Sequence, residues 1–218
     1  MIRTILFDLD GTLADTAPDL AAALNVVRVK HGLAPLPFET IRPHVSHGSI
    51  ALVRIGFGEP EQVPDFDIYR QELLDAYQAN IANETCLFDG MLDVLAHIEA
   101  QNMNWGVVTN KPAYLTLPLM EALGLHKRAA CIVSGDTIAE RKPHPAPMLH
   151  ACHLAGSEAE ECVYIGDAER DIEAGRRAGM QTLVALFGYI GEDEQPEHWG
   201  ASGMIHKPVD IIEWYNNK

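Results

Sequence analysis

Basic residues are scarce in this sequence. Its 218 residues include 16 Lys and Arg against 31 Asp and Glu, which gives a formal net charge of −15 at pH 7. A protein that grips nucleic acid or an anionic membrane surface needs a field of Lys and Arg to neutralise phosphate charge. The acidic excess therefore argues against nucleic acid and against membrane as partners.

Long apolar runs and a cysteine framework are also missing. No stretch approaches the roughly 18 unbroken apolar residues of a membrane helix, and acids at Asp8 and Asp10 follow the first apolar run directly. The four cysteines form no Cys-x-x-Cys pair and are interpreted as reduced core thiols. We expect a soluble, cytoplasmic protein. Its core should be stable without disulfides or a structural metal ion, because a chain of this length buries roughly 70% of its unfolded surface.

Short apolar runs do occur, and they alternate with helical patterns. Near-continuous apolarity in runs of this length is typical of strands covered on both faces of a parallel sheet. The expected strands are 2–7, 105–108, 131–133, 162–165 and 182–186, with a weaker one near 204–205. The expected helices between them are 92–100, 114–123, 146–155 and 171–178. This alternation predicts a doubly wound α/β domain.

One stretch interrupts the alternation. Between the first two expected strands the sequence is typical of helices separated by turns. The first helix is expected to begin at Asp15–Asp19, where a capping residue precedes a proline and an acid. We therefore expect a core made of residues 1–15 and 87–218, with a helical subdomain, residues 16–86, inserted into it.

Polar segments follow four of the expected strands. Ligands of open α/β sheets bind outside the carboxyl ends of the strands. The segments at that edge are Asp8–Thr12, Thr109–Pro112, Arg141–Pro143 and Gly166–Asp171. Each segment alone is as consistent with a turn or a helix cap as with a site. Together they concentrate negative charge that a fold avoids unless a cation compensates it.

These segments resemble the four ordered motifs of the haloacid dehalogenase superfamily of phosphatases. The motifs are FDLDGT, a threonine after an apolar strand, a lysine, and GDAERD. The resemblance covers nearly the whole chain, including the helical insertion, where the family places a mobile cap. It implies a Rossmann-like core and nucleophilic catalysis by the first aspartate.

Carried over position by position, the resemblance implies a role for each catalytic residue. Asp8 would attack phosphorus and become an aspartyl phosphate, and Asp10 would be the general acid and base. Thr109 and the backbone amide of Asn110 would hold the phosphoryl oxygens. Lys142 would neutralise charge on the nucleophile and the phosphoryl group.

The resemblance also implies Mg²⁺ as a cofactor. Its protein ligands would be Asp8, Asp167 and the main-chain carbonyl of Asp10, and Asp171 would orient a metal-bound water or Lys142. The acid at Asp10 favours phosphoryl transfer, because dehalogenases of the superfamily lack an acid there and need no metal. A sugar-phosphate mutase would keep all four motifs, so the core motifs leave that alternative open.

The inserted helices are expected to contact the substrate, a small phosphorylated metabolite. The most site-like turn holds Ser46, His47 and Gly48, although a plain turn between helices is equally consistent with this sequence. Arg42 and Arg54 flank that turn and are candidates for binding a substrate carboxylate. Two aromatic residues near the C-terminus, Tyr189 and Trp199, are expected to be buried against the core rather than to border the pocket.

The identity of the phosphate ester stays open at this point. Length, cap type and motif wording resemble phosphoglycolate phosphatases, whereas strings such as WGVVTNKP and DIEAGRRAG resemble the branch that acts on N-acetylmuramic acid 6-phosphate. Alternatives from other classes are a phosphorelay receiver and a non-catalytic protein that binds a phosphorylated ligand. The receiver is disfavoured because a compact single domain has no room for so long an insertion. The oligomeric state is not indicated by the sequence.

Overall fold

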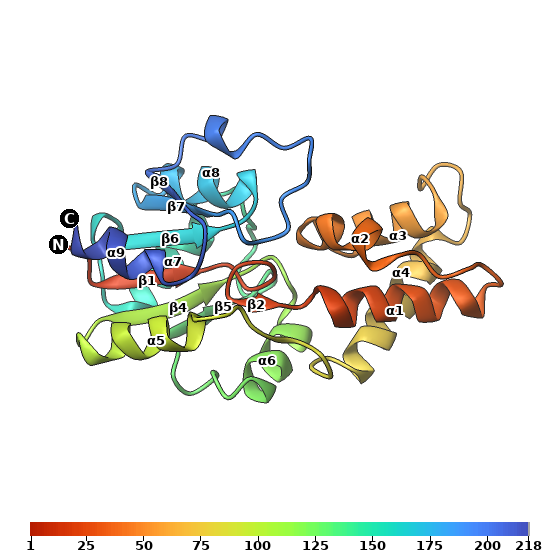
Figure 1. The fold of residues 1–218 in the computed structure, drawn as a ribbon, viewed down its shortest axis with the longest axis horizontal. Coiled ribbons are helices and arrows are strands. Elements are labelled where there is room, and N and C mark those ends of the chain that lie inside the picture. The colour runs from red at the N-terminus through yellow and green to blue at the C-terminus, as the bar shows by residue number, and fades with distance from the viewer. Residues whose placement is uncertain (218) are drawn as a thin grey trace.

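The computed structural model describes residues 1–217 and has a parallel sheet at its centre (Figure 1). The strands are Thr4–Phe7 (β1), Asn104–Val108 (β4), Cys131–Val133 (β5), Cys162–Gly166 (β6), Gln181–Ala185 (β7) and Gly203–Ile205 (β8). Their order is β5-β4-β1-β6-β7-β8, and every neighbouring pair is parallel. Each strand overlaps an expected run, so the predicted α/β core is confirmed.

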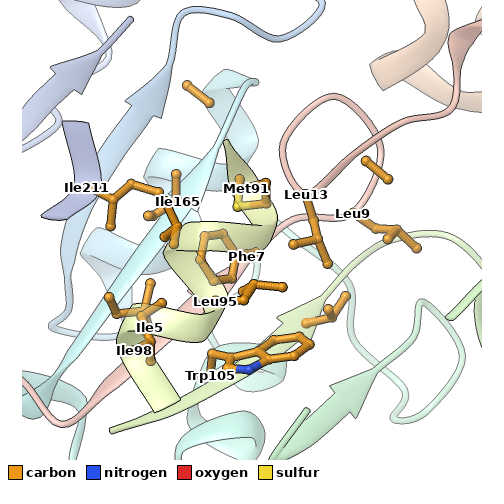
Figure 2. Packing of buried hydrophobic residues seen from close by; sticks show 14 of the residues in the cluster. Ile5, Phe7, Leu9, Leu13, Met91, Leu95, Ile98, Trp105, Ile165 and Ile211 are labelled. Atoms are coloured by element: carbon orange, nitrogen blue, oxygen red, sulfur yellow. The ribbon is translucent and has the colours of Figure 1, made fainter. Parts of the chain in front are cut away.

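Helices cover both faces of the sheet. One face packs against Met91–Ala100 (α5), Ala113–Ala122 (α6) and Asp210–Asn216 (α9), and the other against Ala146–Ala155 (α7) and Glu169–Arg177 (α8). Alternate side chains of β1 supply the two cores, because successive residues of a strand point to opposite faces. Ile5 and Phe7 pack with α5, as Figure 2 shows, whereas Leu6 packs with α7. This is the doubly wound, Rossmann-like arrangement.

The register of the central strands aligns their carboxyl ends. Phe7 is paired with Val107 on one side and with Ile165 on the other. The residues that follow, beginning at Asp8, Thr109 and Asp167, therefore emerge at one edge of the sheet. That edge is where open α/β folds bind ligands.

The chain between Asp15 and Cys86 forms a group of helices beside this edge (Figure 1). The elements are Ala17–Lys30 (α1), Phe38–Ile41 (α2), the 3₁₀ helix Arg42–His47 (η1), Gly48–Phe57 (α3) and Phe66–Ala79 (α4). They share a buried apolar cluster of their own, which includes Leu24, Ile41, Leu52 and Leu73. The division of the chain at residues 16 and 86 stays a prediction.

Several short elements had no sequence signal. Ala14–Asp15 (β2) and Cys86–Leu87 (β3) pair antiparallel where the chain leaves and re-enters the core. Two-residue strands are too short to show periodicity, so this pair was not predicted. The 3₁₀ turns Ala159–Glu161 (η2) and Pro196–His198 (η3) also went unpredicted. Within residues 1–217, every helix is too short or too polar to cross a membrane.

Candidate active site

A buried lysine lies between two carboxylates at the carboxyl edge of the sheet. Lys142 Nζ is 2.8 Å from Asp8 Oδ1 and 2.8 Å from Asp171 Oδ1, and its side chain is only 1% exposed. It also donates a hydrogen bond to the Tyr164 hydroxyl at 2.9 Å, which in turn donates to the Val108 carbonyl at 2.7 Å. The ammonium group is thus held from three sides, and it offsets the charge of two buried acids.

Asp8 is held by one of its two carboxylate oxygens. Oδ1 accepts the Leu9 backbone N–H at 2.7 Å and faces Lys142 Nζ. Both contacts use Oδ1, so Oδ2 is the oxygen left to react. Asp8 also lines a cavity of about 490 Å³, so a carboxylate held in place lies next to an open volume.

Asp167 is surrounded by oxygen and nitrogen donors in a buried position. Its Oδ2 accepts hydrogen bonds from Ser46 Oγ at 2.6 Å and from the Tyr189 backbone N–H at 3.0 Å, and its Oδ1 accepts one from Thr12 Oγ1 at 3.2 Å. Burial and then the negative charges of Asp171 and Asp8 raise the pKa of Asp167 to about 7. The negative charges of Asp8, Asp167 and Asp171 are therefore not fully compensated by nearby positive charge.

Three of the acids are close enough to hold one metal ion. Asp8, Asp167 and Asp171 each offer a carboxylate oxygen, and these oxygens lie within 4.8 Å of one another. Buried carboxylates this close together fit a hard divalent cation such as Mg²⁺. Asp171 uses Oδ1 for Lys142 and accepts the Ala168 N–H on Oδ2 at 3.0 Å, so it is well placed to orient Lys142.

The backbone approaches this acidic cluster where only glycine fits. Gly11 has φ +81°, and a Cβ placed there would come within 2.1 Å of Asp167 Oδ2. A Cβ at Gly188 would come within 2.4 Å of the Asp167 Cβ and of the Gly11 carbonyl oxygen. Glycine at these two positions lets two loops close around Asp167.

Asp10 is positioned by a second lysine. Asp10 Oδ1 accepts hydrogen bonds from Lys111 Nζ at 2.7 Å and from Thr16 Oγ1 at 2.6 Å. Thr16 is the N-cap of α1, as expected for a helix that starts here, yet its hydroxyl binds Asp10 instead of capping the helix. Sequence reasoning missed Lys111 as a site residue, although it lies in the predicted segment two residues after Thr109.

Lys111 also links the core to the inserted helices. Its Nζ lies 4.6 Å from the ring centroid of Tyr77 on α4, a cation–π distance. Burial alone would lower the pKa of Lys111, but the charge of Asp10 and the contact with Tyr77 raise it above the ordinary value. Lys111 is therefore a permanent cation beside Asp10.

The two residues expected to hold phosphate lie beside the acids. Thr109 and Asn110 both line the cavity with Asp8 and Asp10. The Asn110 side chain has a further role that was not predicted. Its Oδ1 accepts the Lys142 N–H and its Nδ2 donates to the Lys142 carbonyl, both at 3.0 Å, which fastens the lysine loop to the threonine loop.

The predicted cap turn reaches the acidic cluster. Ser46 binds Asp167 through its hydroxyl, and its carbonyl accepts a hydrogen bond from Arg170 at 2.5 Å. Ser46, His47 and Gly48 all line the cavity. Burial is the main cause of the lowered pKa of His47. Arg170, which sequence reasoning did not single out, ties α8 of the core to this turn.

Arg42 and Arg54, which flank the cap turn in sequence, have their contacts outside the cavity. Arg54 Nε is 2.8 Å from Glu59 Oε2 at the surface, and Arg42 donates to the carbonyls of Gly188 and Phe187. Neither lines the cavity. Arg42 also sits over the ring of Tyr189 at 4.8 Å. Each guanidinium has its partner outside the cavity, so these contacts do not support the hypothesis that Arg42 or Arg54 binds a substrate carboxylate.

The two C-terminal aromatic residues are buried, as expected. Tyr189 is 1% exposed and Trp199 is 7% exposed. The Tyr189 hydroxyl donates to Asp15 Oδ1 at 2.6 Å and accepts the Ala17 backbone N–H at 3.0 Å. It therefore fixes the point where the chain leaves the core for the inserted helices.

The cavity between the sheet edge and the helices has a volume of about 490 Å³. Small-molecule sites commonly measure about 300–1,000 Å³. Asp8, Asp10, Thr109 and Asn110 line its core side, and residues of η1, α3 and α4 line the opposite side. The cavity can enclose a whole small metabolite with one end against Asp8.

Comparison with known proteins identifies relatives of the whole chain. A sequence model described as haloacid dehalogenase-like hydrolase matches residues 5–185. The chain is 41% identical over 97% of its length to an N-acetylmuramic acid 6-phosphate phosphatase of Pseudomonas aeruginosa, of which the match covers 94%. It is also 41% identical over 97% of its length to a phosphoglycolate phosphatase of Xanthomonas campestris, of which the match covers 95%.

A solved structure has the same fold over the whole chain. It is a crystal structure of a predicted phosphoglycolate phosphatase from Haemophilus somnus, with a TM-score of 0.87 and 25% sequence identity. The superposition covers 98% of each chain, so the inserted helices are included. The resemblance inferred from the motifs is confirmed by these findings.

Proposed function

Because the chain belongs to the haloacid dehalogenase-like hydrolase family and is a phosphatase, we propose that it is a Mg²⁺-dependent phosphomonoester hydrolase that acts through an aspartyl phosphate. The observation that carries this proposal is the pair of acids after β1. Asp8 lines the cavity and keeps its Oδ2 outside the contacts with Leu9 and Lys142, and Asp10 lines the same cavity two residues later. This arrangement supplies a nucleophile and a proton carrier side by side.

The acidic cluster supports the cofactor part of the proposal. Asp8 and Asp167 would hold Mg²⁺ together with the main-chain carbonyl of Asp10, and Asp171 lies close enough to contribute or to orient Lys142. When bound, Mg²⁺ would neutralise charge on the phosphoryl group and the carboxylates. Its ligands would be hard oxygens, as this ion prefers.

The chain's own residues account for the chemical steps. Asp8 Oδ2 attacks phosphorus in line, the bond from phosphorus to the ester oxygen breaks, and Asp10 gives that oxygen its proton. Asp10 then takes a proton from the water that attacks the acyl phosphate, which frees Asp8 and inorganic phosphate. Lys142 and Thr109 stabilise the charge on the phosphoryl oxygens. Splitting the reaction in two is the advantage of a carboxylate nucleophile.

The alternative functions predict different products. A mutase of the same superfamily would return an isomeric sugar phosphate without free phosphate, and a receiver or a binding protein would not turn over. We propose that residues 16–86 act as a cap over the site, which is supported by the contacts of Ser46 with Asp167 and of Lys111 with Tyr77. Closure of such a cap excludes water from the reacting groups.

The test of this function is the release of inorganic phosphate from purified protein. We propose N-acetylmuramic acid 6-phosphate and 2-phosphoglycolate as candidate substrates, because relatives at 41% identity carry these names. Phosphate release on at least one of them, with kcat/KM far above that on common sugar phosphates, is the expected result. Isomerisation without phosphate release would replace the proposal with the mutase.

Chelation should abolish activity, and Mg²⁺ should stabilise the metal-free protein. The pKa of Asp167 in the folded protein is about 7, above its unfolded value of about 3.9, so the folded state loses stability as pH rises from about 4 to 7. A cation beside Asp167 removes that penalty. The increase in Tm on adding Mg²⁺ should therefore be larger at pH 8 than at pH 5.5, as measured by differential scanning fluorimetry. Full activity after exhaustive chelation would contradict the proposal.

Replacing Asp10 should slow the chemistry without weakening binding. Asp10→Asn keeps the size of the side chain but cannot carry a proton, so kcat should fall by about 10²- to 10⁴-fold. The loss should be smaller for an ester with a good leaving group, such as p-nitrophenyl phosphate, because that leaving group needs no proton. Asp15→Asn is the matched carboxylate control, because Asp15 lies five positions later and accepts a hydrogen bond from Tyr189 instead of lining the cavity. Because both esters share the later hydrolysis of the acyl phosphate, the comparison uses kcat/KM, and an equal loss of kcat/KM on both would remove Asp10 from the role of general acid to the leaving group.

A further inference from the structure

One face of helix α4 forms a wall of the cavity opposite the sheet. Arg70, Leu74 and Tyr77 line the cavity, and their spacing of four and three residues places them on one side of the helix. Tyr77 is the end of this wall that lies near the acids, since its ring contacts Lys111, the partner of Asp10. Arg70 is at the other end.

Helix geometry sets the distance between the two ends. Seven residues separate Arg70 from Tyr77, and a rise of about 1.5 Å per residue gives roughly 10 Å along the axis. The two ends of this wall of α4 are therefore about as far apart as the two ends of a substituted sugar ring. The cavity of about 490 Å³ is continuous between them.

The guanidinium of Arg70 is held in place but carries no ion pair. Its Nε donates to Ser49 Oγ on α3 at 3.0 Å, which leaves the two terminal nitrogens as a fork. Within residues 1–217, no carboxylate lies within ion-pair distance of it, although other arginines of this acidic chain, such as Arg54 and Arg128, are paired. An oriented, unpaired guanidinium in a cavity is suited to a planar anion.

The other cations that line the cavity come from the core. Lys111 is paired with Asp10, and Arg170 donates to the Ser46 carbonyl beside the buried acids. Arg141, like Arg70, has no ion pair and donates its Nε to a neutral oxygen, the Gly135 carbonyl at 2.7 Å, but it is exposed and adjoins Lys142 in sequence. Arg70 is thus the arginine that lines the cavity from the inserted helices.

We propose that Arg70 binds a carboxylate of the substrate that lies across the cavity from the phosphate. The substrate class is then a phosphomonoester whose carboxylate and phosphate are separated by a ring or a comparable span. This inference rests on the phosphatase function proposed above. In 2-phosphoglycolate only one carbon separates the carboxylate from the ester oxygen, too short a span to reach both Asp8 and Arg70. In N-acetylmuramic acid 6-phosphate, the lactyl ether on C3 and the phosphate on C6 are separated by ring carbons C3 to C5, so the carboxylate and the phosphate are several bonds further apart.

The test compares two substrates that differ in the carboxylate. N-acetylglucosamine 6-phosphate lacks the lactyl group of N-acetylmuramic acid 6-phosphate but is otherwise the same ester. Arg70→Met should lower kcat/KM on the muramic acid ester by about 10- to 100-fold, mainly through KM, because a charge-assisted bond is lost. It should change kcat/KM on the glucosamine ester by less than about twofold, since that ester has no group for Arg70.

Further variants separate binding from folding. Arg70→Lys should restore part of the preference for the carboxylate, whereas Arg54→Met, which removes a paired surface arginine of the same helical group, should leave both substrates unaffected. Ser49→Ala should lower the preference by a smaller factor, because it frees the guanidinium. If Arg70→Met does not fold, as judged by its Tm, the preference for the carboxylate is compared between wild type, Arg70→Lys and Ser49→Ala instead.

The outcomes are distinct. An equal loss on both esters, or loss of the preference in Arg141→Met instead of Arg70→Met, would overturn the assignment of Arg70. A wild-type kcat/KM on 2-phosphoglycolate above that on the muramic acid ester would overturn the inferred span. Absence of phosphate release from every ester would overturn the proposed function itself, which is a different result from either of these.

Discussion

Asp8→Asn should abolish turnover while leaving the protein folded. An amide oxygen is a poor nucleophile, and loss of the nucleophile in a covalent mechanism costs orders of magnitude, here about 10⁴-fold or more in kcat. The substitution keeps the shape of the side chain and its acceptor for the Leu9 N–H. It also removes one negative charge from the cluster of Asp8, Asp167 and Asp171, so the metal-free variant should be at least as stable as wild type.

The measurements are a phosphate-release assay and a trapping experiment. Wild-type protein quenched in acid during turnover should carry phosphate on Asp8, detectable as an added mass on the peptide that contains it, and Asp8→Asn should carry none. Glu169→Gln, which removes an exposed charge at the start of α8, is the matched control and should behave as wild type. An Asp8→Asn protein with wild-type turnover would refute the mechanism.

Lys142→Met should have the largest effect on stability. The ammonium group is 1% exposed and lies 2.8 Å from both Asp8 and Asp171. Its removal leaves buried carboxylates without their cation, a change that costs about 3–5 kcal/mol in the free energy of unfolding. The apolar Met side chain fills most of the space of the lysine, so the loss of stability comes from the missing charge and not from a cavity. Turnover should fall as well, because the charge on the phosphoryl group loses a stabilising partner.

The loss of stability should depend on pH and on metal. Protonation relieves the uncompensated acids, so the difference in unfolding free energy between Lys142→Met and wild type should be smaller at pH 5 than at pH 8. Added Mg²⁺ should restore part of it. Urea unfolding monitored by circular dichroism measures both effects. The control is Lys207→Met at the surface, whose side chain is 65% exposed. Equal stability of Lys142→Met and wild type at pH 8 would contradict the role of Lys142 in compensating the charges of Asp8 and Asp171.

The fold was largely predictable because its strands are buried on both faces. Such strands appear in the sequence as apolar runs, and the six runs correspond to β1 and β4 through β8. The acids that follow them were predictable as a group, since the end of a run marks the sheet edge where ligands bind. The strands β2 and β3 were not predicted because a run of two residues shows no periodicity.

Partners across the cavity were not predictable from the sequence. Arg42 and Arg54 flank the cap turn in sequence, yet Arg70, more than a dozen residues later, is the arginine of the inserted helices that lines the cavity. Helix packing decides which side of a helix faces inward, and this depends on contacts between distant elements. Lys111 was overlooked for a similar reason, because its partners Asp10 and Tyr77 come from the core and from α4.

The sequence by itself predicted the α/β class and placed the segments that carry the acids and Lys142 at the ends of its apolar runs. These follow from local patterns, namely apolar runs, turn residues and spacing along the chain. Only the tertiary structure decided that Lys142 sits between Asp8 and Asp171, that Ser46 reaches Asp167, and that an unpaired Arg70 lies roughly 10 Å from Tyr77 along α4. The physical reason is that ion pairs and cavity walls join residues far apart in sequence, whose distances are set by packing and not by local propensity.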